Sequence, residues 1–131
     1  MIKTFGLTHI TLKVQDVKRS SDFYHKIFGT QEMYHSEGFI QIQTPGSHDI
    51  IVFEQGEKSI GECAGISHFG FRLVKPENIQ DITTIVEEAG GIIKDQGEFE
   101  AGEPYVFVND PDGYLVEIWY EKLGPNHISF I

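Results

Sequence analysis

Three residues of this 131-residue chain have the types and the spacing that a metal centre needs. His9 and His68 lie 59 residues apart in the similar stretches THITLKV and SHFGFRLV, and Glu117 lies within the apolar run GYLVEIWYE. A carboxylate in the middle of a strand is costly to bury unless it is paired, protonated or bound to a metal. Two neutral imidazoles and one carboxylate can hold a divalent transition metal and leave positions open for substrate. The three residues therefore predict one divalent metal ion, with iron, manganese, nickel and zinc as candidates.

The elements that must position these residues form two similar modules. In the first module, residues 5–54, the alternation and the helical stripe predict a strand, a helix and three strands, at 5–14, 17–29, 31–37, 39–45 and 48–54. In the second module, residues 66–121, the same order is predicted, with strands at 66–74, 92–99, 104–110 and 113–121. The helix between the first two strands is expected to have Pro76 in its first turn and an apolar stripe from Ile79 to Ala89. Residues 55–65 are predicted to be a linker and 122–131 a C-terminal tail. The repeat predicts an α+β fold built from two βαβββ modules.

Capping residues predict where the helices begin and end, and the alternation within the strands predicts the positions of the two histidines. Asp16 is expected to cap the first helix at its N-terminus, and Gly29 is expected to end it. Pro76 is expected in the first turn of the second helix. His9 and His68 are expected at mid-strand, on the face of each sheet that is turned away from its helix.

The composition narrows the class of partner. Ten basic and twenty acidic residues give a net charge of −10, which argues against nucleic acid and against an anionic membrane surface. The single cysteine, Cys63, excludes an intrachain disulfide and fits a reducing compartment. No run of membrane-spanning length and no signal peptide is evident, so we expect a cytoplasmic protein. The remaining histidines are expected to be solvated side chains: His25, His35, His48 and His127.

The chain resembles the vicinal oxygen chelate superfamily, which includes glyoxalase I, extradiol dioxygenases, fosfomycin-resistance thiol transferases and bleomycin-binding proteins. The residues that carry the resemblance are THITLKVQDVKRSSDFYHKIFG (8–29), ISHFGFRLV (66–74) and NDPDGYLVEI (109–118). The resemblance implies that the paired modules form a curved mixed sheet around a central cavity. It implies that His9, His68 and Glu117 are the metal ligands. It also implies a homodimer, with possible exchange of modules, in which His9 could meet the other two ligands from another chain.

Each branch of the superfamily fits these residues differently. Glyoxalase I adds a fourth, glutamate ligand, but alignment on Gly56 places Ile50 there, and its same-face neighbour Val52 is also apolar. Extradiol dioxygenases keep a tyrosine where this chain has Phe107. Fosfomycin-resistance enzymes need cations for the phosphonate, and the inward faces offer mainly Lys13 and Arg72. The bleomycin-binding branch has the fold without the metal, and it is the main non-enzyme alternative.

The sequence thus predicts a metal-dependent enzyme that acts on a small oxygenated substrate. The metal would hold the substrate by two oxygens, or by one oxygen beside a water, and would stabilise an anionic oxygen as a Lewis acid. The alternative is a drug- or antibiotic-binding protein without turnover. No dedicated catalytic acid or base is identified. Phe5 and Leu7 are expected to join the pocket walls, and the predicted substrate-binding residues are Thr11, Ile50, Val52, Arg72, Tyr105, Phe107 and Trp119.

Overall fold

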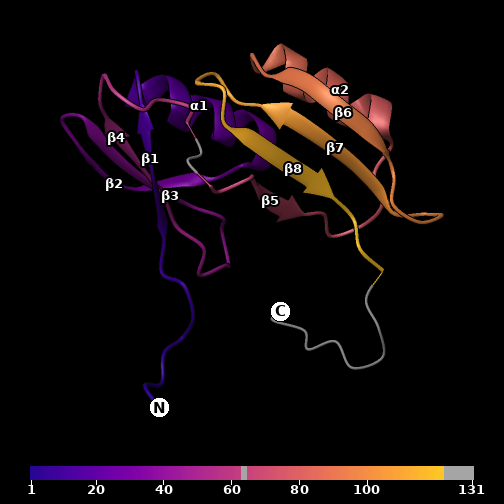
Figure 1. Cartoon of the computed structure of the whole chain (residues 1–131), viewed down its shortest axis with the longest axis horizontal. Coiled ribbons are helices and arrows are strands. Elements are labelled where there is room, and N and C mark those ends of the chain that lie inside the picture. The colour runs from indigo at the N-terminus through magenta and orange to yellow at the C-terminus, as the bar shows by residue number, and fades with distance from the viewer. Residues whose placement is uncertain (63–64, 123–131) are drawn as a thin grey trace. The chain divides into compact units, whose positions relative to one another are not determined.

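The computed structural model describes residues 1–62 and 65–122, which form two compact units, Met1–Gly61 and Glu62–Ile131 (Figure 1). Each unit has the order strand, helix and three strands, so the predicted α+β fold with a repeated βαβββ module is confirmed. Cys63 and His127, for which predictions were made above, lie outside the described residues.

The first unit is a mixed sheet with one helix on its face. Its elements in chain order are β1 (Ile10–Val14), α1 (Val17–Phe28), β2 (Gln31–Ser36), β3 (Phe39–Gln43) and β4 (Ile51–Gln55). The strands are arranged in the order β1-β4-β3-β2, with β1 parallel to β4 and the other pairs antiparallel. Helix α1 contacts β3 and β4. Tyr24 of α1 is fully buried, with its ring centroid 5.4 Å from that of Phe53, and Ile40 and Ile42 are also buried in the core.

The second unit repeats this topology. Its elements are β5 (Phe69–Arg72), α2 (Ile79–Glu88), β6 (Ile92–Glu98), β7 (Pro104–Asn109) and β8 (Leu115–Trp119). The strand order is β5-β8-β7-β6, with β5 parallel to β8 and the other pairs antiparallel. Helix α2 contacts β6 and β7, and every second residue of β7 and β8 is buried. The opposite face of β7 and β8 therefore presents the residues between them, and Glu117 is one of these.

The ends of α1 lie where the sequence predicts them, whereas the start of α2 does not. The Oδ1 atom of Asp16 accepts hydrogen bonds from the backbone N–H groups of Lys18 and Arg19 at 3.0 and 3.1 Å. Gly29 ends α1 in the left-handed region, with φ of 68°. The prediction for Pro76 is wrong, because Asn78 caps α2 with its side chain and the helix starts at Ile79.

The strands that follow the two histidines begin later than predicted. β1 and β5 start at Ile10 and Phe69, so His9 and His68 each precede a strand by one residue, and the mid-strand prediction is wrong. The physical reason is pairing, since the register of β1 with β4 starts only at Ile10 and Ile51. Glu117 lies at the centre of β8, as predicted.

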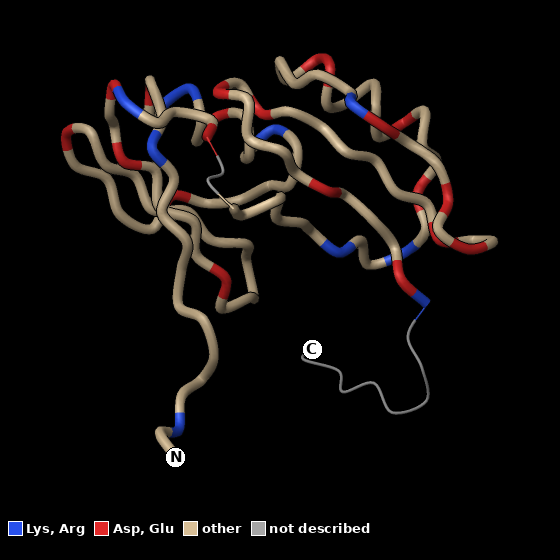
Figure 2. Tube along the Cα trace, in the orientation of Figure 1, with Lys and Arg blue, Asp and Glu red and all other residues tan. Residues whose placement is uncertain are grey.

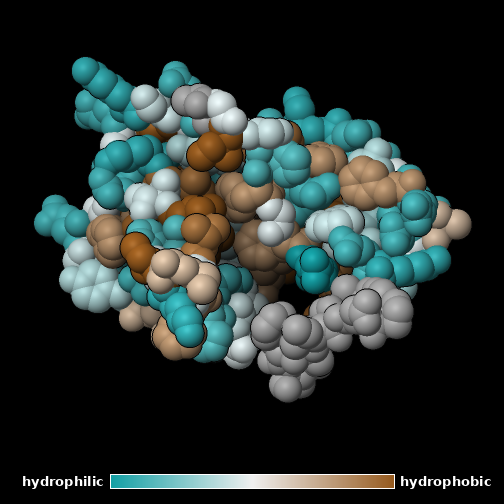
Figure 3. All heavy atoms as spheres, turned by 60° about the horizontal axis from the view of Figure 1, so that its bottom comes forward, coloured by the Kyte–Doolittle hydropathy of each residue, from teal (hydrophilic) through white to brown (hydrophobic). Residues whose placement is uncertain are grey.

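Charge and exposed apolar side chains are distributed over both units. Acidic residues, red in Figure 2, occur along the N-terminal and the C-terminal unit. Hydrophobic side chains reach the surface among the hydrophilic ones (Figure 3), and the large exposed ones include Phe5, Leu7, Met33 and Ile66. Among the described residues no helix has the length and the apolar character to cross a membrane.

Candidate metal centre

The second unit brings two of the three predicted ligands together. The Nε2 atom of His68 lies 3.7 Å from the Oε1 atom of Glu117. The side chain of Glu117 is only 13% exposed and that of His68 is 33% exposed. A largely buried carboxylate beside one imidazole nitrogen is an arrangement that a divalent cation would stabilise.

The close approach depends on a glycine in the neighbouring strand. Gly70 and Glu117 are direct partners in the parallel pair of β5 and β8. A Cβ atom on Gly70 would lie 3.3 Å from the Cβ atom of Glu117 and 3.4 Å from its Oε1 atom. The missing side chain therefore leaves the space in which the carboxylate lies. His68 precedes Gly70 by two residues, which puts its ring near the same face of the sheet.

Two further residues, Ser67 and Phe107, contact the His68 ring. Its Nδ1 atom lies 2.9 Å from the Oγ atom of Ser67. Phe107, the partner of Glu117 in β7, meets the ring edge to face, with centroids 5.1 Å apart at 83°. The ring is thus oriented from two sides, and Nε2 is the nitrogen that faces the carboxylate.

The first unit contributes His9 in a similar setting. Its Nδ1 atom lies 2.7 Å from the Oγ1 atom of Thr8, and the residue is exposed. Two residues further on, Thr11 pairs with Val52, just as Gly70 pairs with Glu117 in the second unit. Val52, rather than Ile50, is therefore the counterpart of Glu117 in the repeat. Both are apolar, so a fourth carboxylate ligand is absent from this position under either alignment.

Neither unit, over its described residues, brings three His, Cys, Asp or Glu side chains together on its own. The residues nevertheless fit a divalent metal in type. The His68 ring presents Nε2 toward Glu117, and His9 carries the same contact between Nδ1 and a hydroxyl. A histidine ligand commonly makes an outer hydrogen bond through the nitrogen that does not bind the metal.

An aromatic cluster lies on the same face of the second sheet. The ring of Tyr105 stacks on Phe99, with centroids 4.2 Å apart and planes at 16°. Trp119 meets Phe99 edge to face at 5.9 Å, and Phe107 meets Tyr105 at 5.7 Å. Three of these rings were predicted from the alternation in β7 and β8. Phe99 was predicted as the last residue of the strand 92–99 but was not assigned to the site; it lies one residue past the end of β6.

Tyr105 carries the hydroxyl of this cluster. It donates a hydrogen bond to the Oδ2 atom of Asp95 at 3.3 Å. Burial, together with the charge of Asp95 and this hydrogen bond, raises the pKa of Tyr105 above its ordinary value. The phenol therefore stays protonated at neutral pH and is suited to donate a hydrogen bond rather than to remove a proton.

The other predicted substrate-binding residues are less enclosed. Thr11 and Arg72 are exposed, and Arg72 makes no ion pair with any described residue. Lys13 forms an ion pair with Glu54. Val52 is buried, and Ile50 lies one residue before β4. Phe5 and Leu7, expected as pocket walls, lie in an N-terminal segment without regular structure and are fully exposed.

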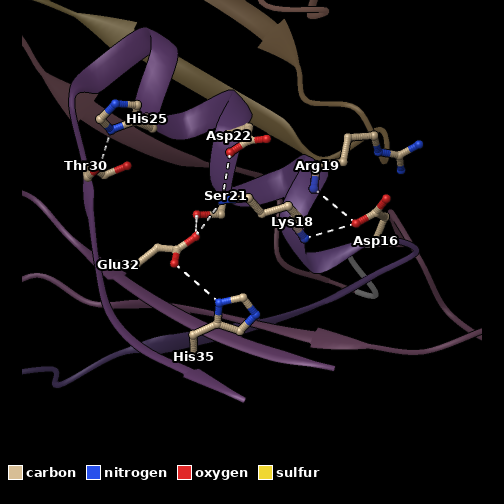
Figure 4. Close-up of polar contacts among 9 residues, drawn as sticks. All are labelled: Asp16, Lys18, Arg19, Ser21, Asp22, His25, Thr30, Glu32 and His35. Carbon is tan, nitrogen blue, oxygen red and sulfur yellow. Dashed lines mark hydrogen bonds and ion pairs between the residues drawn. The ribbon is translucent and has the colours of Figure 1, made fainter. Parts of the chain in front are cut away.

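A second group of polar side chains lies where α1 faces β2 (Figure 4). The Oε1 atom of Glu32 accepts hydrogen bonds from the Oγ atom of Ser21 at 2.9 Å and from Lys18 at 3.3 Å. His35 lies 3.5 Å from its other oxygen. Burial alone would raise the pKa of Glu32, but the bonds from Ser21 and Lys18 and the nearby positive charges outweigh it and lower that pKa. The Glu32 carboxylate is satisfied within the unit, so we assign it the structural role of holding β2 to α1.

The other described histidines of the first unit are exposed to solvent. His25 and His48 are exposed, and the side chain of His35 is 51% exposed, as predicted for solvated residues. His25 also makes a contact within the protein, since its Nδ1 atom lies 2.7 Å from the backbone oxygen of Thr30. That contact joins the last turn of α1 to the residue before β2.

Comparisons with known proteins agree with the fold and with the predicted resemblance. The sequence profile of the Glyoxalase/Bleomycin resistance protein/Dioxygenase superfamily matches residues 6–118. Lactoylglutathione lyase of Escherichia coli O157:H7 is 25% identical over 126 residues, which are 88% of this chain and 93% of that protein. Lactoylglutathione lyase GLX1 of Arabidopsis thaliana is 26% identical over 125 residues, 84% of this chain, but the match spans only 42% of that relative.

Solved structures show the same fold at low identity. Fosfomycin resistance protein FosX from Listeria monocytogenes, complexed with Mn(II) and a sulfate ion, has a TM-score of 0.76 and 22% identity, covering 92% of this chain and 94% of that one. FosX from Mesorhizobium loti has a TM-score of 0.73 and 19% identity, with 92% and 96% covered.

Proposed function

The chain belongs to the glyoxalase/bleomycin resistance protein/dioxygenase superfamily, and we propose that it is a divalent-metal-dependent enzyme acting on a small oxygenated molecule. His9, His68 and Glu117 would hold the metal, either within one chain or between two chains of a homodimer. The observation that carries this proposal is the 3.7 Å approach of the His68 Nε2 atom to Glu117 beside the space left by Gly70. The Mn(II) named with the FosX structure from Listeria monocytogenes supports a divalent metal in this fold.

The metal, when bound, would supply Lewis-acid stabilisation of a substrate oxygen as negative charge develops there. The protein residues supply the position. Phe107 and Ser67 hold the His68 ring from two sides, and the strand pair β5–β8 fixes Glu117 beside it. Three protein ligands leave open coordination positions, which substrate oxygens would occupy.

The aromatic cluster would form the wall of the substrate site. Tyr105, Phe107 and Trp119 lie on the same face of the sheet as Glu117 and would exclude water from the reacting oxygens. Thr11 and Arg72 would supply the polar contacts, because their side chains are exposed and lie in β1 and β5, the strands that follow the two histidines.

The lactoylglutathione lyase reaction itself is a poor fit to these residues. That chemistry removes a proton next to a carbonyl, which needs a base. Val52 lies at the counterpart of Glu117, and an apolar side chain cannot take a proton. We therefore propose a reaction in which the substrate oxygen is stabilised by the metal and no second carboxylate of the protein is required.

A second candidate function is binding of a small molecule without turnover, as in the bleomycin-resistance branch. The observation that favours it is the half-exposed ring of Phe99 stacked on Tyr105, which offers a flat apolar surface. Asp95 accepts the hydrogen bond of the Tyr105 hydroxyl and thereby fixes the edge of that surface.

The test compares metal content in wild-type protein, Glu117→Gln and the control Glu121→Gln, which changes a carboxylate four residues further along the chain. Each protein is incubated with Mn²⁺, Fe²⁺, Ni²⁺ or Zn²⁺, desalted and analysed. We expect the wild type and Glu121→Gln to retain metal and Glu117→Gln to lose it. If the wild type retains none of the four ions, the enzyme proposal fails and the binding function stands.

A further inference from the structure

Each predicted histidine ligand is preceded by a residue with a hydroxyl group. The Oγ1 atom of Thr8 lies 2.7 Å from the Nδ1 atom of His9. The Oγ atom of Ser67 lies 2.9 Å from the Nδ1 atom of His68. The same contact thus occurs in both units, at the same point of the repeat, one residue before the strand begins.

This contact is not a consequence of regular strand geometry. In a strand, neighbouring side chains point to opposite faces of the sheet, so residues i and i+1 do not meet. The two pairs meet because they lie just outside β1 and β5. The residue type differs between the units, threonine in one and serine in the other, so the feature that they share is the hydroxyl group.

The hydroxyl group can accept from a protonated Nδ1 or donate to an unprotonated one, so a metal at Nε2 selects the Nδ1–H tautomer and the hydroxyl group stabilises it. A neutral imidazole has one N–H donor and one acceptor nitrogen, and the bond made by one nitrogen fixes the role of the other. A hydroxyl oxygen that accepts from Nδ1–H leaves the lone pair on Nε2. In the second unit Nε2 is the nitrogen that lies 3.7 Å from Glu117.

From these contacts we infer that Thr8 and Ser67 are positioning residues, which hold His9 and His68 in the tautomer and orientation that present Nε2 to a divalent metal. The inference rests on the proposed function, since it assumes that both histidines bind the metal. Neither hydroxyl touches substrate in this assignment, and each acts only through its neighbouring imidazole.

The test measures the dissociation constant for Zn²⁺ and for Mn²⁺ by equilibrium titration of the metal-free full-length protein. Thr8→Val and Ser67→Ala remove the hydroxyl at nearly constant volume, and each is expected to weaken binding about 10-fold, the lower end of what loss of an outer hydrogen bond costs a metal site. Thr8→Ser and Ser67→Thr keep the hydroxyl and are expected to bind like wild type. Thr4→Val is the matched control, because its hydroxyl contacts only the backbone of Gly6.

A second readout is spectroscopic. Nitrogen NMR of the Zn²⁺-loaded protein reports which nitrogen of each ring binds the metal and which carries the proton. We expect metal-bound Nε2 and Nδ1–H for His9 and His68 in the wild type, and a shifted Nδ1 resonance for the ring next to a removed hydroxyl. Thermal unfolding shows whether each variant is folded.

The outcomes separate the two proposals. If wild-type protein binds neither ion, the proposed function fails and this inference falls with it. If wild type binds but Thr8→Val and Ser67→Ala bind equally well, the proposed function stands and the inference is overturned. The inference is also overturned if the serine and threonine exchanges weaken binding as much as removal of the hydroxyl.

Discussion

Gly70 lies directly opposite Glu117 in the parallel pair of β5 and β8, and a Cβ atom at position 70 would lie 3.2 Å from the backbone oxygen of Glu117 and 3.3 Å from its Cβ atom. The equivalent pair in the first unit is Thr11 and Val52. The two units share one topology, but only the second has a carboxylate at this position and a glycine opposite it, because Glu54 of β4 pairs instead with Lys13. This asymmetry within the repeat is consistent with a single carboxylate in the proposed three-ligand set.

Gly70→Ala is expected to weaken metal binding with little change in stability. The added Cβ atom would lie 3.2 Å from the backbone oxygen and 3.3 Å from the Cβ atom of Glu117, so Glu117 must shift by a few tenths of an ångström and its carboxylate shifts with it. Alanine itself favours the strand by about 0.5–1 kcal/mol over glycine, which offsets part of the crowding. The measurement is Zn²⁺ affinity together with the free energy of unfolding.

Gly97→Ala is the matched control for that experiment. Its Cβ atom would meet the ring of Tyr105, at 3.0 Å from the hydroxyl oxygen, and not Glu117. An equal loss of metal affinity in both variants would contradict the role assigned to Gly70.

Val52→Glu tests the correspondence between the two units. Val52 is 6% exposed, so an unpaired carboxylate there is expected to destabilise the metal-free protein by about 3–5 kcal/mol. If His9 binds the metal, added Zn²⁺ should raise the melting temperature of this variant more than that of wild type. Ile50→Glu is the control, because Ile50 lies outside β4. Added Zn²⁺ should raise the melting temperature of this variant no more than that of wild type. A larger Zn²⁺-induced rise in melting temperature for Ile50→Glu than for Val52→Glu would show that Ile50, and not Val52, is the counterpart of Glu117.

Phe99→Ala is expected to disturb the aromatic cluster without affecting the metal ligands. Loss of the stack on Tyr105 and of the edge contact with Trp119 should destabilise the protein by about 1 kcal/mol. Trp119 is the single tryptophan of the chain, so its fluorescence reports on this site alone. We expect a red shift of the emission, with unchanged Zn²⁺ affinity. An unchanged emission spectrum would show that the ring contacts do not form in solution.

Glu32→Gln tests the structural role of the contacts between α1 and β2. The folded-state pKa of Glu32 is lowered, so the carboxylate contributes stability above its unfolded pKa and loses it as pH falls through the folded value. We expect the variant to be about 1 kcal/mol less stable at pH 7, since a bond to a charged, partly exposed group is lost. The difference should shrink as the pH falls below about 4.3, the ordinary pKa of glutamate. A difference that is constant from neutral to acidic pH would contradict the pKa assignment.

The order of elements and the ends of α1 could be predicted from the sequence, because the signals are local. Asp16 and Gly29 act through neighbouring backbone groups, so the sequence around them is sufficient. The start of α2 was misplaced because Pro76 and Asn78 both signal a helix start, and the side chain of Asn78 makes the cap.

The details of the site depended on pairing between distant strands. Neither the late start of β1 nor the pairing of Val52 with Thr11 follows from alternation within one strand, since both depend on the register with β4. The role of Gly70 has the same origin, because its neighbour Glu117 is 47 residues further along the chain. The three candidate ligands were predicted from their types and from the repeat, and their role as ligands stays a prediction.

The most direct test of the central claim is a Zn²⁺ titration of metal-free wild type, His9→Gln, His68→Gln and Glu117→Gln, with His48→Gln as the control for an exposed histidine. The account predicts one ion per chain for the wild type and the control. It predicts that each ligand variant loses more affinity than the roughly 10-fold to 100-fold that an outer partner contributes. Unchanged Zn²⁺ binding by His9→Gln, alongside loss in His68→Gln and Glu117→Gln, would contradict a site built from both units.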